Sequence, residues 1–385
     1  MLVSNLTGGL CSATAAIAIS FASATIATAE IITVTDIAGR TVEVEKDPSD
    51  VVLGEGRLIY ALALLDREDP FERIAGWKDD LILYDPDAYR KYLAAFPEAE
   101  TIPRLGSPYS GEWSLETVIS LGTDLVIMNL GELAQATESG ILEKLDEAGI
   151  ATVFVDFRFN PTENTVPSIQ LLGRIFDERD DADAFTDFYN AQMHVIDARV
   201  EAIPMEERPV VFIEQAAGID ADQACCRTFG GTNLGRLVDL AGGRNWGTSR
   251  VPGVGSDVSF EAVLTDDPAI VIGTGANWSE SKPSTTAVLL GYEATPDAVQ
   301  ARLAALAARD GWSEMAAVKN GRFHSVYHQF YNSPYHFVAM QAFAKWIHPE
   351  LFADLDPEAT MRELHEQFLP IDYSGVFWAT LDHTN

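Results

Sequence analysis

Residues 114–127 read SLETVISLGTDLVI, and residues 259–272 read SFEAVLTDDPAIVI. In each stretch a serine can accept a hydrogen bond from the first turn of a helix, and the apolar spacing then changes from helical to continuous. Each stretch therefore predicts a short helix, a polar turn and a buried strand. Two such copies, far apart in one chain, indicate two α/β lobes of similar plan.

Each copy carries a glutamate at its third position, Glu116 in the first and Glu261 in the second. A carboxylate in the first turn of a helix interacts favourably with the helix dipole, so either glutamate alone is explained by helix stability. Their equivalent placement in two lobes favours a shared function.

The composition is that of a folded, acidic protein. A chain of 385 residues exceeds one ordinary core, and 47% hydrophobic with 22% charged residues is typical of globular lobes. The formal net charge of -32 argues against nucleic acid or an anionic membrane surface as the main partner, since both are negatively charged. An anionic ligand would need arginine or lysine close by.

Residues 1–29 contain no charged side chain, and the apolar run 13–26 ends in Ala27-Thr28-Ala29. This pattern is typical of a secretory signal, although the positive start is missing, and the run is short for a membrane span. We expect export, cleavage near Ala29 and a soluble mature protein. The mature chain keeps Cys225 and Cys226, whose adjacency favours a vicinal disulfide in an oxidising compartment, with two free thiols as the alternative.

Short apolar strands alternate with helices through most of the chain, which predicts an α/β fold with mainly parallel central sheets. We expect an N-terminal lobe over 30–165, connecting helices over 166–204 and a C-terminal lobe over 205–385. One connecting segment, 180–203, predicts a single long helix, a stiff link between lobes. In such sheets ligands bind beyond the carboxyl ends of the strands.

These features resemble the class III periplasmic substrate-binding proteins of ABC importers, which carry ferric siderophores, cobalamin or haem. The resemblance covers about residues 30–370 and rests on the paired Ser-x-Glu helices with their strands, the helical connector and the run from Tyr331 to Phe352. It implies a periplasmic, monomeric protein, not an enzyme and without a cofactor, that delivers a metal chelate to a permease. It also implies that Glu116 and Glu261 lie on one exposed surface and pair with permease arginines, which sets orientation more than affinity.

The loops after the strand ends supply a candidate cleft of aromatic and cationic side chains. This mixture suits a bulky anionic Fe(III) chelate, because aromatic faces cover the organic shell and guanidinium groups bind its oxygens. Each tryptophan in the set could equally serve core packing. The candidates are Arg57, Trp77, Lys78, Tyr84, Arg104 and Tyr109 in the first lobe, and Arg227, Trp246, Trp278, Tyr327, His328 and Tyr331 in the second.

His328 or Tyr331 could complete the coordination of a bound metal, but the sequence has no compact metal-ligand motif. Two alternatives remain at this point. The same fold could bind a corrinoid, haem or a metal oxyanion, or the chain could be an exported hydrolase that uses Glu214, His328 and Tyr331 as an acid/base site. Against the hydrolase, the sequence has no nucleophile elbow, zinc-binding His pair or phosphate loop.

Overall fold

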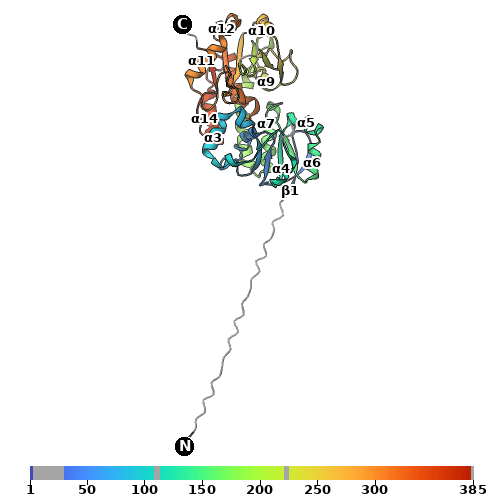
Figure 1. Cartoon of the computed structure of the whole chain (residues 1–385). Helices are drawn as coiled ribbons and strands as arrows, with labels where there is room; N and C mark the ends of the chain where they lie inside the picture. Colours follow the sequence, from blue (N-terminus) through green and yellow to red (C-terminus); the bar gives the residue numbers. More distant parts are fainter. Residues whose placement is uncertain (3–29, 108–112, 221–224, 383–385) are drawn as a thin grey trace.

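Two β-sheets form the centres of two lobes, with helices around and between them (Figure 1). The computed structural model describes residues 1–2, 30–107, 113–220 and 225–382. Most of the predicted signal segment and Tyr109 lie outside these described residues. The α/β architecture expected from the sequence is confirmed.

The N-terminal sheet has five strands in the order β5-β4-β3-β6-β7, and every neighbouring pair is parallel. A separate antiparallel hairpin, β1 (Ile31–Thr35) with β2 (Thr41–Glu45), precedes it. Because the strands are parallel, their carboxyl ends lie along one edge of the sheet. The five strands are β3 (Val51–Leu53), β4 (Ile74–Lys78), β5 (Arg104–Leu105), β6 (Leu125–Asn129) and β7 (Ala151–Val155).

The C-terminal sheet is parallel at its centre and antiparallel at both edges, in the order β11-β9-β8-β12-β13-β14 with β10 beside β8. The parallel strands are β8 (Val210–Glu214), β10 (Arg244–Asn245), β12 (Ile270–Gly275) and β13 (Phe323–Tyr327). The antiparallel strands are β9 (Arg227–Phe229), β11 (Gly255–Asp257) and β14 (Trp378–Thr380).

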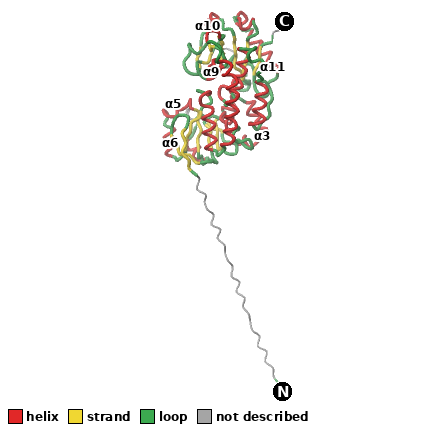
Figure 2. Tube along the Cα trace, turned by 180° about the vertical axis from the view of Figure 1, so that it is seen from behind, coloured by secondary structure: helices red, strands yellow, loops and turns green. Residues whose placement is uncertain are grey.

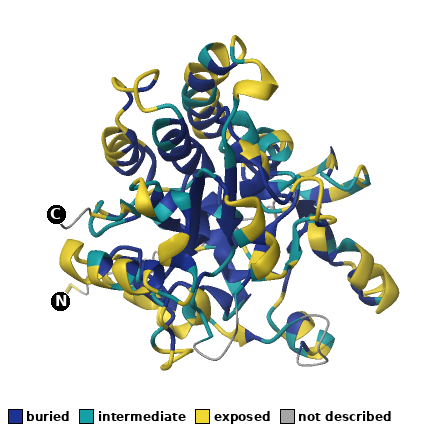
Figure 3. Cartoon of the chain, turned by 90° about the horizontal axis from the view of Figure 1, so that it is seen from above, coloured by how far each residue is buried: buried dark blue, intermediate teal, exposed yellow. Residues whose placement is uncertain are grey.

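Helices cover both sheets, with their exposed faces outward and the buried strands inside (Figure 3). The first-lobe helices are α1 (Ile59–Leu62), α2 (Asp80–Tyr84), α3 (Pro86–Ala95), α4 (Leu115–Ser120), α5 (Leu133–Glu138) and α6 (Ile141–Glu147). Those after the connector are α9 (Asn233–Leu240), α10 (Phe260–Asp266), α11 (Pro296–Ala307), α12 (Ala316–Lys319), α13 (His336–Ile347) and α14 (Pro357–Phe368). Two 3-10 helices follow strand ends, η1 (Gly56–Leu58) after β3 and η6 (His328–Asn332) after β13.

Two helices connect the lobes, α7 (Pro161–Ile175) and α8 (Arg179–Val200). The first begins with Pro161, earlier than residue 166, because proline suits the first helical position and Pro167 is accommodated within the helix. The second has 22 residues and is about 33 Å long. Seen from behind, long helices run between the two lobes (Figure 2). None of the helices in the described part of the chain has an apolar stretch long enough to cross a bilayer.

The two faces of the N-terminal sheet contribute to different hydrophobic clusters. Alternate residues of a strand point to opposite faces, so Val126 packs with Val118 of α4 while Leu125 and Ile127 join the large cluster. That large cluster continues into the C-terminal lobe. The lobes therefore share apolar packing as well as a covalent connection.

Candidate functional site

Side chains that follow the carboxyl ends of strands in one lobe form hydrogen bonds with the other lobe. Nη1 of Arg57, just after β3, donates to Oε1 of Gln329 at 3.1 Å and to the hydroxyl of Tyr331 at 2.7 Å, both in η6. Asn332 Nδ2 donates to Glu55 at 3.2 Å. The strand ends of the two sheets thus meet in one interlobe site.

Arg57 is the centre of this site, although it is only 5% exposed. Its Nε donates to Asp80 at 2.6 Å, and its guanidinium carbon lies 5.5 Å from the ring centroid of Tyr84 and 5.4 Å from that of Tyr331. Within the described residues, its donors are largely engaged by protein groups. Arg57 therefore braces the two lobes and presents a positive charge between two aromatic rings.

A second arginine, Arg158, stands at the edge of the same site and was not among the predicted residues. Its Nη1 donates to the buried carboxylate of Glu55 at 2.8 Å, while a quarter of its side chain remains exposed. Although burial favours the protonated form of Glu55, Arg158 and Arg57 hold the pKa of that carboxyl below its ordinary value.

The position of Arg158 is set by Asp156, a buried residue directly after β7. Its carboxylate accepts from the backbone N–H groups of Arg158, Phe159 and Asn160, at 2.9, 2.6 and 2.8 Å. Phe159 is exposed beside Arg158. Because both follow a parallel strand, the rule that ligands bind beyond strand ends could have identified them from the sequence.

Aromatic side chains surround the guanidinium on the C-terminal side. His328 is 4.5 Å from Tyr331 between ring centroids and 5.1 Å from Trp278, whose edge it meets. Tyr331 is half-buried and Tyr84 is exposed, whereas Trp278 is buried behind His328. Tyr84, Tyr331 and His328 are therefore brought together with Arg57, and Trp278 supports them.

Besides Trp278, which packs behind His328, three predicted ligand contacts are wrong, because packing directs their side chains elsewhere. Trp77 is 1% exposed and packs in the first lobe against Phe71 and Tyr89. Trp246 is buried in the second lobe, where its Nε1 donates to Asp266 of α10 at 2.7 Å. Strand-end tryptophans turned into a lobe core are unavailable to a ligand bound between the lobes.

Tyr327 is the third predicted ligand contact that packing excludes. It ends β13 and is buried, and its hydroxyl donates to Oδ2 of Asp85 in the opposite lobe, as does the hydroxyl of Tyr60. The residue contributes to the contact between lobes and not to an open ligand surface. Burial, acting against the bonds from both tyrosines, raises the pKa of Asp85 to about 6.

Among the described residues, the remaining predicted cations form no hydrogen bond with Arg57, His328 or Tyr331. Lys78 is half-buried at the end of β4. Arg104 is exposed and donates to the hydroxyl of Tyr89 at 3.3 Å. Arg227 is about half exposed at the start of β9, where Nε donates to Gln215 at 3.0 Å.

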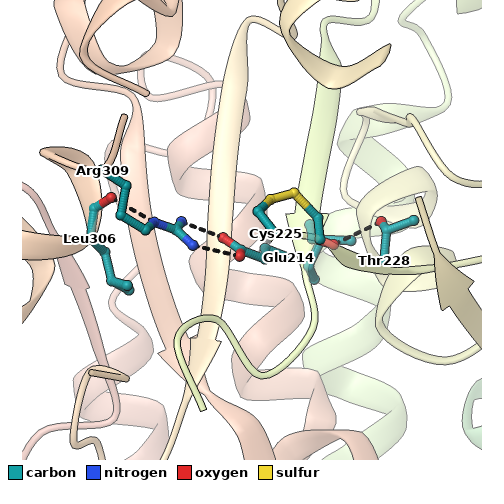
Figure 4. The surroundings of a disulfide bond; sticks show 7 residues. Glu214, Cys225, Thr228, Leu306 and Arg309 are labelled. Atoms are coloured by element: carbon teal, nitrogen blue, oxygen red, sulfur yellow. Dashed lines mark hydrogen bonds and ion pairs between the residues drawn. A yellow bond between two sulfur atoms is a disulfide. The ribbon is translucent and has the colours of Figure 1, made fainter. Parts of the chain in front are cut away.

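Arg227 follows a vicinal disulfide between Cys225 and Cys226 (Figure 4). Beside the disulfide, Arg309 donates to both carboxylate oxygens of Glu214, at 2.7 and 2.6 Å. Glu214 and the two cysteines are the one group of three His, Cys, Asp or Glu ligands that come close enough for a metal, among the residues described. Since the sulfurs are bonded to each other and the carboxylate to arginine, this group is not a metal site in the oxidised protein.

The two glutamates of the repeated stretches are exposed in the first turns of α4 and α10. The two helices lie toward the far ends of the two lobes (Figure 1). A partner that contacts both glutamates must therefore extend over most of the length of the molecule.

Comparison with known proteins agrees with this two-lobe architecture. Residues 68–327 match the family model described as periplasmic binding protein. The chain belongs to the periplasmic binding protein family. The class III resemblance seen in the sequence is thereby confirmed.

This binding protein is similar to the TroA-like periplasmic binding protein FepB from Veillonella parvula, with a TM-score of 0.82 and 31% identity over 91% of this chain and 100% of that one. It is 23% identical to the uncharacterised ABC transporter substrate-binding lipoprotein YvrC of Bacillus subtilis (strain 168), over 77% of this chain and 78% of the relative. The molybdate periplasmic binding protein MolA of Haemophilus influenzae shares the fold, with a TM-score of 0.67 and 17% identity over 89% and 99% of the two chains.

The binding protein is therefore a substrate-binding component of an ABC transporter, with a permease partner and a small-molecule ligand. The family and these relatives are transporter proteins and not enzymes, which decides against the hydrolase alternative. The family is periplasmic or extracellular, whereas cleavage near Ala29 stays a prediction.

Proposed function

We propose that the protein captures a ferric siderophore or a similar iron chelate between its lobes and delivers it to the permease. The observation that carries this proposal is the collection of cationic and aromatic side chains at the interlobe strand ends of a chain whose net charge is -32. Arg57 and Arg158 lie beside Tyr84, Tyr331 and Phe159 there. Such a surface favours an anionic ligand with an aromatic or extended organic shell.

Binding would combine charge-assisted hydrogen bonds from arginine with burial of the organic shell. Arg158 and Arg227 have partly exposed side chains that can bind a ligand directly, while Arg57 is buried and supplies positive charge to the site. The disulfide would stiffen the loop leading into Arg227. In this proposal the protein has no cofactor of its own, because the metal arrives and leaves with the cargo.

The test is the ligand retained by the mature protein after native purification from iron-limited cells. We expect native mass spectrometry to show an added iron chelate and the visible spectrum to show its charge-transfer band. Retention of haem, a corrinoid or an oxyanion such as molybdate would contradict the proposed cargo.

A matched pair of variants tests the site in the same experiment. Arg227→Gln should lower the affinity for the retained chelate about tenfold, a typical effect of one charge-assisted hydrogen bond. Arg250→Gln is the control, since Arg250 is similarly exposed but is paired with Asp266 of α10 and lies over the ring of Trp246, which is turned into the lobe core. Equal affinities for both variants would place the ligand elsewhere.

For delivery, Glu116 and Glu261 would each pair with an arginine of the permease. Their equivalent positions in the two lobes and their exposure support this role.

A further inference from the structure

His328 begins η6 immediately after β13 and is held by residues from two neighbouring strands. Its Nδ1 lies 2.8 Å from Oγ1 of Thr274 in β12. The same Oγ1 accepts a hydrogen bond from the backbone N–H of Ala216, just after β8, at 2.7 Å. Thr274 is completely buried and His328 is 8% exposed.

This arrangement decides which ring nitrogen of His328 carries the proton. A threonine hydroxyl has one hydrogen to donate and lone pairs to accept with, and Ala216 occupies one lone pair. Among the described residues, the one other hydrogen-bond partner of this hydroxyl is Nδ1 of His328. A buried hydroxyl is unfavourable without an acceptor, so Oγ1–H donates to Nδ1 and the ring proton resides on Nε2.

The ring holds a single proton at neutral pH. Burial, together with the positive charge of Arg57, lowers the pKa of His328 to about 3. Nε2 has no hydrogen-bond partner among the described residues. The ring contacts Tyr331, the residue that receives the hydrogen bond from Arg57.

We propose that His328 acts in the ligand site as a hydrogen-bond donor through Nε2–H and not as a metal ligand, because a protonated nitrogen has no lone pair for a metal. This inference rests on the proposed function and refines it. The hydroxyl oxygen of Tyr331 accepts from Arg57, which leaves its hydrogen to donate as well. The site would then offer two hydrogen-bond donors, from His328 and Tyr331, beside the guanidinium of Arg57. Such a site favours a cargo whose outer atoms are oxygens and whose metal is already fully coordinated by its chelator.

The protonated nitrogen can be read directly by ¹⁵N NMR of the metal-free mature protein labelled at histidine. The same chain supplies both references. His336 donates from Nδ1 to the carbonyl of Ser333 and accepts at Nε2 from Tyr189, whereas His348 uses Nε2 to donate to the carbonyl of Gly242. We expect His328 to give the Nε2-protonated pattern of His348. The pattern of His336 would overturn the proposal.

A pair of threonine variants tests the cause of this preference. Thr274→Ser keeps the hydroxyl and should keep the Nε2-protonated pattern, while Thr274→Val removes it and should give a mixture of the two tautomers. An unchanged pattern in a folded Thr274→Val protein would overturn the assignment to Thr274. If that variant does not fold, the wild-type spectrum still decides the tautomer.

Binding of a ferric trihydroxamate, in which all six metal positions are filled, separates donation from metal ligation. We expect His328→Phe to weaken binding about tenfold and His328→Gln, which keeps an N–H donor, to restore most of it. Equal losses in both variants, or binding of Ni²⁺ alone that depends on His328, would overturn the donor role. Failure of the wild-type protein to bind any ferric chelate would instead contradict the proposed function. The NMR measurement of the His328 tautomer would not be affected by that result.

Discussion

Asp85 shows how a single buried carboxylate connects the two lobes. Tyr60 from the first lobe and Tyr327 from the second both donate to its Oδ2. Its Oδ1 also accepts from the backbone of Ala88 at the start of α3, at 3.5 Å. Burial outweighs these bonds and raises the pKa of Asp85 from 3.8 to about 6.

This raised pKa predicts a stability change in mildly acidic solution. The native protein keeps the Asp85 proton to higher pH than the unfolded chain, so its free energy of unfolding should fall as pH rises from about 4 to about 6. Asp85→Asn has no proton to lose. Relative to this variant, the wild type should lose about 3 kcal/mol across that window, measured by urea unfolding.

Asp310→Asn is the matched control, because Asp310 is an exposed aspartate. It should reproduce the pH dependence of the wild type. If Asp85→Asn and the wild type keep a constant difference in stability between pH 4 and 6, Asp85 does not titrate there.

At the scale of elements, the connection between lobes depends on the close contact of α7 and α8. Gly173 of α7 faces α8, and a Cβ at this position would overlap the Cβ of Ala182 and lie 2.9 Å from the carbonyl oxygen of Glu178. The absence of a side chain at residue 173 lets the two helices approach. The helices α7 and α8 therefore form a closely packed, rigid connection and not two loosely joined helices.

Gly173→Ala should destabilise the protein, although alanine is the better helix former. We expect a loss of about 1–3 kcal/mol in the free energy of unfolding, because overpacking at Ala182 exceeds the gain in helix propensity. Adding Ala182→Gly should recover part of that loss, measured by the same urea titration. A single variant more stable than the wild type would show that the helices separate at little cost.

At the scale of the whole molecule, α4 and α10, which carry the equivalent exposed glutamates, lie toward the far ends of the two lobes (Figure 1). Contact with both requires a partner that extends across the two lobes. Paired charges of this kind fix orientation and register more than they add affinity. Delivery of the cargo to the permease should therefore depend on both glutamates. Capture of the cargo should depend on neither of them.

We expect Glu116→Ala combined with Glu261→Ala to reduce transporter-dependent uptake of the retained chelate at least tenfold in cells. Chelate affinity of the purified double variant should equal that of the wild type, because both residues lie outside the interlobe site. The control combines Glu143→Ala with Glu363→Ala, which removes two other exposed glutamates, on α6 and α14. Wild-type uptake by the Glu116 and Glu261 variant would rule out the docking role.

The sequence alone predicted the two-lobe plan, the helical connector and the strand ends that carry the candidate site. These features follow from local patterns: helical or continuous apolar spacing, proline at helix starts, and polar residues after parallel strands. The repeated stretch 114–127 and 259–272 was informative because each copy folds into the same helix, turn and strand. The place of Glu116 and Glu261 in the exposed first turns of α4 and α10 follows from that same local structure.

Only the tertiary structure decided which strand-end side chains reach the interlobe site. Trp77 and Trp246 are turned into the lobe cores, and the side chain of Arg158 is held in the site by Glu55, 103 residues away, because packing and distant hydrogen bonds set the direction of each side chain. Arg57 donates hydrogen bonds to Gln329 and Tyr331, which lie 272 and 274 residues away in the chain. The proton position on His328 likewise depends on two neighbouring strands, which no local sequence pattern specifies.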